Sequence, residues 1–237
     1  MKLTSLRILM VLFFTFIFFS CTKEMNIKDM GFEKSFSIAK KKYLNENYIQ
    51  ALDDFNVLLL NYGGETGIDS VQFLLADTHY KLGEYYSASY EFNRLTESFP
   101  ESKLAEESYF NSAMSYNELS PIYSLDQKET FTAISKFQFY LDLYPFGKFA
   151  EKSNEHIILL REKLAKKEFE SGRLYLKMDQ PRAAKLYFQE IINNYYDTSY
   201  YVQSLKFIAE AYDSMKDNYN SHLFEKKYEE ALKDNAK

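Results

Sequence analysis

One pattern of small and aromatic side chains recurs along the 237-residue chain and restricts its fold more than any other feature. An alanine is followed, at spacings of four, three and four, by an aromatic residue, an apolar or aromatic residue and a second aromatic residue. Those spacings place all four side chains on one face of an α-helix. The four occurrences are Ala51, Phe55, Leu58 and Tyr62; Ala88, Phe92, Leu95 and Phe99; Ala133, Phe137, Tyr140 and Tyr144; and Ala184, Phe188, Ile191 and Tyr195. We therefore expect four helices that pack through the same face.

The alanine and the first aromatic residue of each occurrence are predicted to form the core of a repeat. The small alanine lets a neighbouring helix approach closely, and the ring fills the space beside it. Aromatic residues at helical spacing usually serve packing, and only rarely line a ligand site. The predicted repeat core is Ala51, Phe55, Ala88, Phe92, Ala133, Phe137, Ala184 and Phe188.

Turn signals separate the predicted helices. The four occurrences run into the segments "NYGG", "SFPES", "LYPFG" and "NYYDT", and the prolines in two of them cannot continue a helix. Before the first two occurrences, tyrosines recur eight and three positions ahead of the alanine, which indicates another helix and a bend. We expect Asn47 and Gly83 at those bends, because both residues tolerate left-handed backbone.

The repeating unit is therefore a helix, a short turn and a second helix, and it resembles the tetratricopeptide repeat, whose period is about 34 residues. The intervals between the alanines are 37, 45 and 51 residues, and the longest one fits a long helix from about Phe149 to Leu176. A degenerate fifth unit, with helices near Tyr200 to Met215 and Asn220 to Lys233, is expected as a cap. We predict an all-α, tetratricopeptide-like solenoid of about five repeats in one domain over residues 32–237, with repeats near 32–64, 68–101, 102–147, 148–197 and 198–234.

The only cysteine, Cys21, follows an apolar run over residues 8–19 and the small Ser20. This run is short for a membrane span, which needs about 20 residues, and suits the core of a signal peptide. A lone cysteine in this place resembles a bacterial lipoprotein signal, in which the peptidase cuts before the cysteine and the thiol carries a diacylglycerol. We predict a removed signal peptide over 1–20 and a lipidated Cys21 in a short tether over 21–31. The alternative is an ordinary signal peptide or an anchor helix with an incidental cysteine.

Charge and motifs argue against several classes of function. Loss of Lys2 and Arg7 with the signal peptide lowers the net charge from −5 to about −7, which is unfavourable for binding nucleic acid. The histidines (His79, His156 and His222) are isolated, and the sequence has neither a paired-histidine metal motif nor a glycine-rich phosphate loop. A nucleophile, a base and an orienting group cannot be nominated together, so we expect no enzyme activity, metal or cofactor.

The segment "SPIYSLDQKETFTAISKFQFYLDLYP", residues 120–145, resembles the third repeat of the BamD family of outer-membrane assembly lipoproteins, in its Bacteroidetes-like form. Residues 71–100 resemble the second repeat of that family, and residues 159–177 resemble its long helix. The resemblance implies an outer-membrane protein assembly factor, held by its lipid at the periplasmic face of the outer membrane. It also implies binding to the barrel-forming BamA subunit, to unfolded outer-membrane proteins and to other assembly lipoproteins.

The loop within residues 120–130 is the candidate contact surface for such partners, because a long insertion in a compact repeat often has a function. The candidate contact residues are Ser120, Pro121, Tyr123, Asp126 and Gln127. Their alternative role is structural, since Asp126 and Glu129 have the spacing of a helix-capping pair. The alternative function is that of a tetratricopeptide adaptor lipoprotein that coordinates cell-wall synthesis or envelope constriction, for which this loop would not be needed.

Overall fold

The computed structural model describes residue 27 and residues 30–235, and this part of the chain contains ten α-helices and no β-strand. The helices are α2 (Phe32–Leu44), α3 (Tyr48–Asn61), α4 (Ile68–Lys81), α5 (Tyr85–Ser98), α6 (Ala105–Leu119), α7 (Lys128–Leu143), α8 (Ala150–Lys177), α9 (Pro181–Asn194), α10 (Tyr200–Ser214) and α11 (Asn218–Asn235). The predicted all-α fold class is confirmed. The predicted signal peptide and Cys21 lie outside the described residues.

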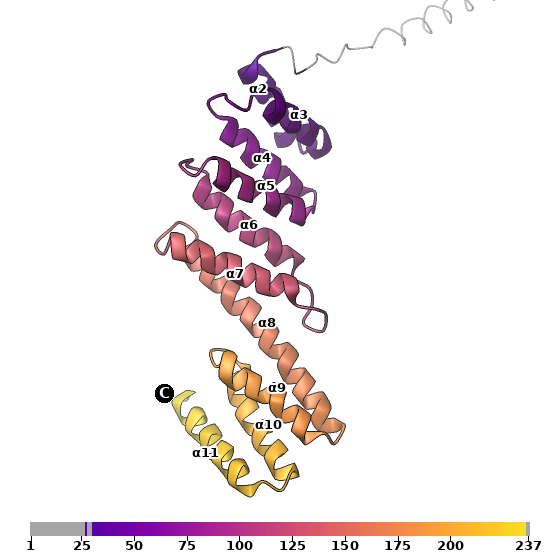
Figure 1. The fold of residues 1–237 in the computed structure, drawn as a ribbon, viewed down its shortest axis with the longest axis vertical. Helices are drawn as coiled ribbons and strands as arrows, with labels where there is room; N and C mark the ends of the chain where they lie inside the picture. The colour runs from indigo at the N-terminus through magenta and orange to yellow at the C-terminus, as the bar shows by residue number, and fades with distance from the viewer. Residues whose placement is uncertain (1–26, 28–29, 236–237) are drawn as a thin grey trace, which may run out of the picture.

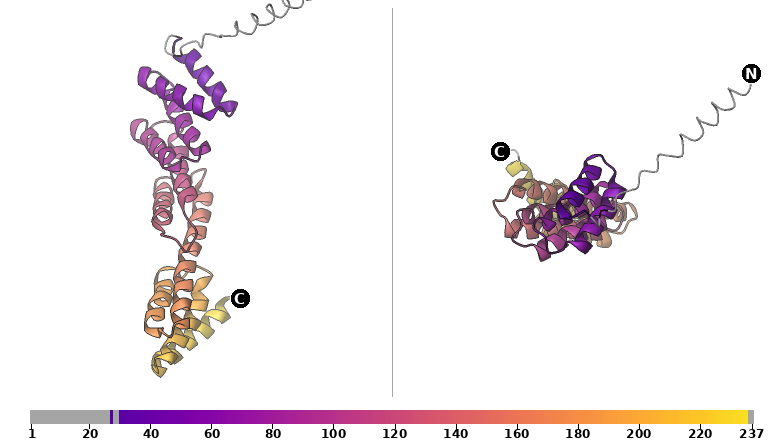
Figure 2. Two further views of the ribbon diagram at one scale, coloured as in Figure 1. Left: turned by 90° about the vertical axis from the view of Figure 1, so that its right-hand side faces the viewer. Right: turned by 90° about the horizontal axis from the view of Figure 1, so that it is seen from above.

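Each helix from α2 to α10 packs against the next one along the chain. Figure 1 shows the result as an elongated stack in which the chain runs from one end to the other, and Figure 2 shows how narrow the stack is when it is seen from above. Beyond neighbouring helices, α2 also contacts α4, and α8 also contacts α10. Contacts between helices close in sequence are the hallmark of a solenoid built from helix pairs.

The predicted repeat core lies at the centre of the stack. Its members Ala51, Phe55, Ala88, Phe92, Ala133, Phe137, Ala184 and Phe188 all have an exposed fraction of 0%. Gly172 of α8 shows how close the helices come, since a Cβ atom placed there would lie 2.7 Å from Cζ of Phe188. The small residues therefore set the distance between helices, and the rings fill the space that remains.

In four of the helix pairs, the bend between the two helices contains one residue with left-handed backbone. Gly83 has a φ of 76°, as expected, but the left-handed residue of the first repeat is Glu46 (φ 61°) and not Asn47 (φ −79°). The expectation for Asn47 was wrong by one position. Asp179 (φ 55°) and Lys216 (φ 60°) occupy the matching bends before α9 and α11. Four helix pairs therefore share this turn geometry, although only one of them has glycine at the left-handed position.

Helix α8 has 28 residues and belongs to both halves of the stack. Its first half packs in a cluster with α6 and α7 that includes Phe149 and Leu160, and its second half packs with α9 and α10 through Leu164 and Phe169. Ile134 of α7 contacts both of these clusters. Figure 1 shows α8 running continuously between the upper helices and the lower group of α9, α10 and α11.

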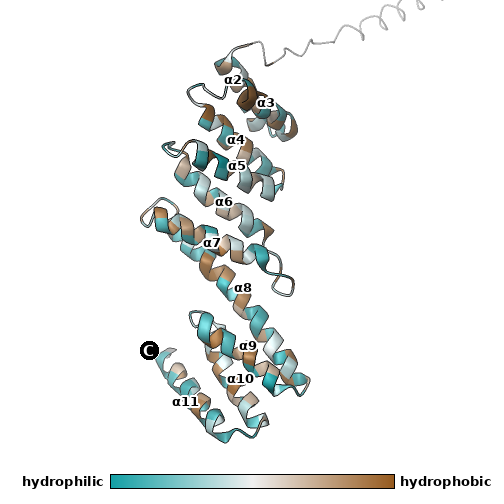
Figure 3. Ribbon diagram, viewed as in Figure 1, coloured by the Kyte–Doolittle hydropathy of each residue, from teal (hydrophilic) through white to brown (hydrophobic). Residues whose placement is uncertain are grey.

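Polar residues occur along every helix of the described part (Figure 3), and none of these helices is both long and apolar enough to span a bilayer.

Candidate partner-binding surface

The connection between α6 and α7 is the longest loop inside a helix pair, and it is built around Gln127. Only 4% of Gln127 is exposed. Its Nε2 donates hydrogen bonds to the carbonyl oxygens of Ile122 (2.9 Å) and Leu125 (3.0 Å), while its Oε1 accepts one from Thr130 Oγ1 (2.8 Å). A side chain with all these bonds inside the protein organises the loop and is not available to a partner.

Ser120 also has a structural position. Its Oγ lies 2.5 Å from Thr130 Oγ1 and accepts a hydrogen bond of 2.8 Å from Lys163 Nζ of α8. Burial lowers the pKa of the Lys163 ammonium, because the charge loses part of its hydration. The start of the loop is therefore attached to α8 by a residue 43 positions away in the sequence.

Two further lysines of α8 hold the loop. Lys167 Nζ donates to the carbonyl oxygen of Leu125 at 2.5 Å, and Lys166 Nζ lies 4.6 Å from the centre of the Tyr123 ring, within the range of a cation–π contact. Positions 163, 166 and 167 share one face of a helix, because residues three and four apart are neighbours. Helix α8 thus presents a row of lysines along which the loop lies.

Asp126 binds the first backbone N–H of α7, although it is one position further from the helix than a usual cap. Its Oδ1 accepts a hydrogen bond from the backbone N–H of Lys128 at 3.0 Å, although the residue that precedes α7 is Gln127. Glu129 does not complete a capping box, because its Oε1 accepts a hydrogen bond from Tyr86 Oη of α5 at 2.8 Å. Asp126 itself is exposed, whereas Pro121 and Tyr123 are half-buried.

Sequence reasoning missed the most exposed apolar residues of this region. Ile122 is 67% exposed, Leu125 is 55% exposed and Leu159 of α8 is 64% exposed. A hollow of about 330 Å³ lies among residues of the loop, α8 and α10. We call it the loop–α8 surface, and its lining residues are Ile122, Tyr123, Leu159, Glu162, Lys163, Lys166 and Tyr200.

The charges of the loop–α8 surface are mainly positive, and none of its lysines is neutralised by a carboxylate of the described residues. Within the described part of the chain, Lys163, Lys166 and Lys167 form no ion pair with a carboxylate. The carboxylate of Glu162 is occupied by Ser199, whose backbone N–H and Oγ donate to it at 2.7 and 2.9 Å at the start of α10. Exposed apolar side chains beside unpaired lysines suit a protein partner that offers apolar and acidic groups.

Among residues 27 and 30–235, no group of three or more His, Cys, Asp or Glu side chains could hold a metal ion. His156 lies flat against Phe137, with 5.1 Å between ring centres. Burial lowers the pKa of His156, which favours a neutral, packed imidazole.

Comparison with known proteins identifies the family. The family model YfiO, described as an outer membrane lipoprotein, matches residues 28–226. The chain therefore belongs to this family of outer membrane lipoproteins, and the predicted BamD-type family is confirmed.

Two curated relatives carry the name outer membrane protein assembly factor BamD. The protein from Rickettsia prowazekii is 28% identical over 167 residues, which cover 70% of this chain and 66% of the relative. The protein from Caulobacter vibrioides is 28% identical over 134 residues, which cover 56% of this chain and 44% of the relative. The matches therefore span less than two thirds of the length of each relative.

Solved structures match more loosely. The crystal structure of MamA protein aligns with a TM-score of 0.37 and 15% identity, over 85% of this chain and 92% of that one. The TPR2AB-domain:pHSP90 complex of yeast Sti1 aligns with a TM-score of 0.47 and 17% identity, over 84% of this chain and 76% of that one. Similarity at this level has no bearing on function.

Proposed function

We propose that this chain is a non-catalytic scaffold of outer-membrane β-barrel assembly, which binds the BamA-type barrel protein and unfolded outer-membrane proteins at the periplasmic face of the outer membrane. The observation that carries the proposal is the match of the family model to residues 28–226, together with the two relatives named as BamD assembly factors. A solenoid of helix pairs suits this role, because it offers long surfaces to a protein partner and to an extended chain.

The loop–α8 surface is the proposed docking site for the BamA-type protein. Its exposed apolar residues Ile122 and Leu159 would enter the interface, and the unpaired lysines beside them would meet acidic groups of the partner. The proposed lipid anchor at Cys21 would keep this surface close to the membrane in which the barrel protein is embedded.

The decisive experiment measures binding of the detergent-solubilised full-length lipoprotein to the purified periplasmic domains of the BamA-type protein of the same organism. We expect saturable binding that is weakened about tenfold by Ile122→Ser combined with Leu159→Ser, since each is an apolar contact at a buried interface. The matched control combines Leu44→Ser and Leu60→Ser, which are 66% and 82% exposed on α2 and α3. No detectable binding of the wild-type protein would refute the scaffold role, and equal loss in both double variants would refute the docking site.

The proposed reception of unfolded outer-membrane proteins is tested separately. A urea-denatured outer-membrane protein is diluted into buffer with or without the lipoprotein, and its aggregation is followed by light scattering. We expect suppressed aggregation at equimolar concentration, because a bound chain cannot pair its strands with other copies. Unchanged scattering would remove this part of the proposal without affecting the binding to the BamA-type protein.

The proposed anchor is tested by Cys21→Ala. The wild-type protein should take up radiolabelled palmitate in cells and fractionate with the outer membrane. The variant should lose the label and enter the soluble fraction if processing still occurs, or remain as an uncleaved precursor. A labelled Cys21→Ala variant would show that the lipid is attached elsewhere.

A further inference from the structure

Helix α2 lies at one end of the stack (Figure 1) and packs mainly on α3, with a smaller contact to α4. Its buried residues Phe32, Ser35 and Ala39 recur at helical spacing and form the face that is turned towards the stack. Among the described residues, no helix covers the opposite face. The composition of this outer face therefore indicates what the end of the solenoid meets.

Lysines dominate the outer face of α2. The helix contains four lysines and a single acidic residue, Glu33. Lys34 and Lys41 each follow a buried residue by two positions, which is rather more than half a turn, so both lie on the side opposite the buried face. Lys40 lies beside Lys41, and all three lysines are exposed.

These three ammonium groups are not neutralised within the fold. In the part of the chain that the structure describes, Lys34, Lys40 and Lys41 form no ion pair with a carboxylate. The fourth lysine of the helix, Lys42, does pair with Asp54 of α3 at 2.6 Å. Three charges of α2 thus remain open to a partner outside the described residues.

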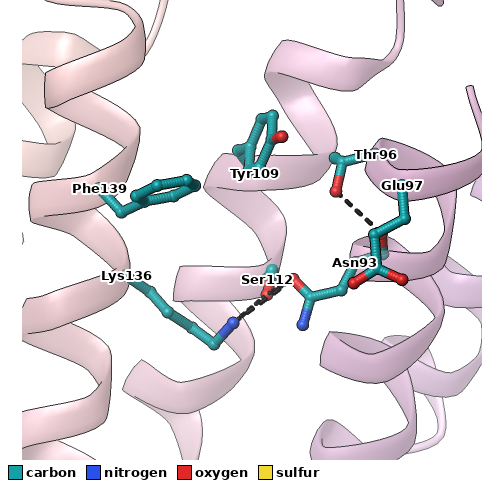
Figure 4. A pocket seen from close by; sticks show the side chains of 7 residues that line it. All are labelled: Asn93, Thr96, Glu97, Tyr109, Ser112, Lys136 and Phe139. Carbon is teal, nitrogen blue, oxygen red and sulfur yellow. Dashed lines mark hydrogen bonds between the residues drawn. The ribbon is translucent and has the colours of Figure 1, made fainter. Parts of the chain in front are cut away.

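Lys136 of α7 shows what a lysine engaged by the fold looks like. Figure 4 shows its side chain in the pocket between α5, α6 and α7, where Nζ donates to Ser112 Oγ at 3.0 Å. Lys136 is half-buried, whereas the three lysines on the outer face of α2 are exposed. The lysines of α2 therefore serve no comparable role in packing.

The positive charge of α2 is local. At the other end of the stack, α11 contains three lysines and four acidic residues, and the whole chain has a net charge of −5. An acidic protein is repelled by an anionic surface unless it presents a positive face to it. The outer face of α2 would therefore orient the molecule on such a surface.

The chain before α2 places this face near a membrane. Ile27 is only 9% exposed, and its carbonyl oxygen accepts a hydrogen bond of 2.7 Å from Oγ of the buried Ser35. Residue 27 is thus fastened to α2, and only six positions separate it from Cys21. Six residues span at most about 20 Å when fully extended. The lipid proposed at Cys21 would therefore hold α2 within this distance of the bilayer.

Exposed apolar residues continue the outer face at the end of α2. Leu44, three positions after Lys41, is 66% exposed, and Ile49 at the start of α3 is 67% exposed. Lysines beside exposed apolar side chains are typical of a helix that lies at a membrane surface, where ammonium groups meet phosphates and apolar groups reach the acyl boundary. The position of this face beside the proposed anchor favours a lipid surface over an acidic protein.

We propose that the outer face of α2 lies on anionic phospholipid headgroups of the membrane that holds the anchor, with contacts from Lys34, Lys40 and Lys41. The inference rests on the proposed lipid at Cys21 and is independent of the proposed binding to the BamA-type protein. Contact through α2 would give the anchored stack a defined orientation on the bilayer.

The test uses the absence of tryptophan from the chain, because a single introduced indole then reports its own surroundings. The lipoprotein with Leu44→Trp is incorporated through its lipid into vesicles of bromine-labelled zwitterionic phospholipid, with or without phosphatidylglycerol. We expect emission at shorter wavelength and quenching by bromine only when phosphatidylglycerol is present. Tyr219→Trp, at a residue of α11 that is 78% exposed, should remain unquenched in the same vesicles.

Charge variants in the Leu44→Trp protein test the lysines. Each lysine near an anionic surface strengthens association about fivefold, so Lys34→Gln combined with Lys41→Gln should abolish the quenching. The matched control combines Lys226→Gln and Lys233→Gln, which have the same spacing on α11, and it should retain the quenching. Arginine at positions 34 and 41 should also retain it, and circular dichroism checks that each variant is folded.

Flotation of the vesicles on a density gradient separates two kinds of failure. Protein that does not float with the vesicles would refute the proposed anchor, and this inference with it. Protein that floats while the introduced indole stays in water would overturn the inference alone. Quenching that persists without phosphatidylglycerol, or after the loss of Lys34 and Lys41, would overturn it as well.

Discussion

The hydroxyl of the fully buried Tyr140 on α7 donates a hydrogen bond of 2.8 Å to the carboxylate of Glu106 on α6. The same two groups also bind the turn that leads into α8. Tyr140 Oη accepts from the backbone N–H of Phe149 at 3.0 Å, and Glu106 Oε1 accepts from that of Lys148 at 2.6 Å. The pair therefore joins α6, α7 and the start of α8.

Replacing Tyr140 by phenylalanine is expected to lower the free energy of unfolding by about 1–3 kcal/mol. The ring would remain in place, but the buried N–H of Phe149 would lose its acceptor. Urea unfolding followed by circular dichroism measures the change, with Tyr90→Phe as the control because that ring is 62% exposed. An unchanged midpoint in Tyr140→Phe would show that water replaces the hydroxyl.

Alkaline pH should destabilise the protein through the same residue. Burial, together with the hydrogen bond to Glu106, raises the pKa of Tyr140 to about 12, above its ordinary value of 10.0. The folded state then holds the proton more tightly than the unfolded state, so this stabilisation is complete below about pH 10 and is lost as the pH rises towards 12.

The pH effect is isolated by comparison with the variant. Burial also raises the pKa values of Tyr43 and Tyr80, so the wild-type protein loses stability from several sources. The difference in unfolding free energy between the wild type and Tyr140→Phe should shrink from pH 10 upward. A difference that stays constant up to pH 11.5 would contradict the raised pKa of Tyr140.

Gly172→Ala should destabilise the protein by about 1–3 kcal/mol, although alanine favours a helix interior by about 1 kcal/mol over glycine. The added methyl group would lie 2.7 Å and 2.8 Å from two carbon atoms of the Phe188 ring. Thermal unfolding measures the loss. Phe188→Leu in the same chain should recover part of it, since the two changes share one contact.

Lys216→Gly should stabilise the protein by about 1 kcal/mol. Lys216 has a φ of 60° in the bend before α11, where any side chain with a Cβ is strained and glycine is not. The greater freedom of glycine in the unfolded chain offsets part of the gain. The mirror experiment is Gly83→Ala, at a φ of 76° with no atom within 4 Å of the new Cβ. The melting temperature of Gly83→Ala should fall, whereas that of Lys216→Gly should rise. A change in the same direction in both variants would contradict the explanation by backbone strain.

The helical face of the repeats could be predicted because it depends on residues close together in sequence. Ala51 and Phe55 are four positions apart, and their burial follows from the period of the helix they share. The left-handed residue in the bend before α3 was harder to predict from the sequence. Asn47 has the residue type that favours a left-handed backbone, but the geometry of the pair assigns this conformation to its neighbour Glu46.

The candidate site was only partly predictable, because its parts come from distant segments. The sequence predicts the loop within 120–130 and a contact role for Gln127, but the side chain of Gln127 is buried. The lysines that hold the loop lie about 40 positions further on, and nothing in a local pattern links Lys163 to Ser120. Lys136 looks like an ordinary surface lysine between Ser135 and Phe137, and only the approach of α5 and α6 removes it from solvent.

Helix α8 sets the distance between the helices that pack against its two ends. At about 1.5 Å per residue, its 28 residues form a rod of about 42 Å that is packed at one end against α7 and at the other against α9. The loop–α8 surface lies along this rod, and the C-terminal helices are attached to its far end. Two molecules bound at the two ends would therefore be held at a set separation and a set relative angle. The chain would thus act as a spacer as well as a binding surface.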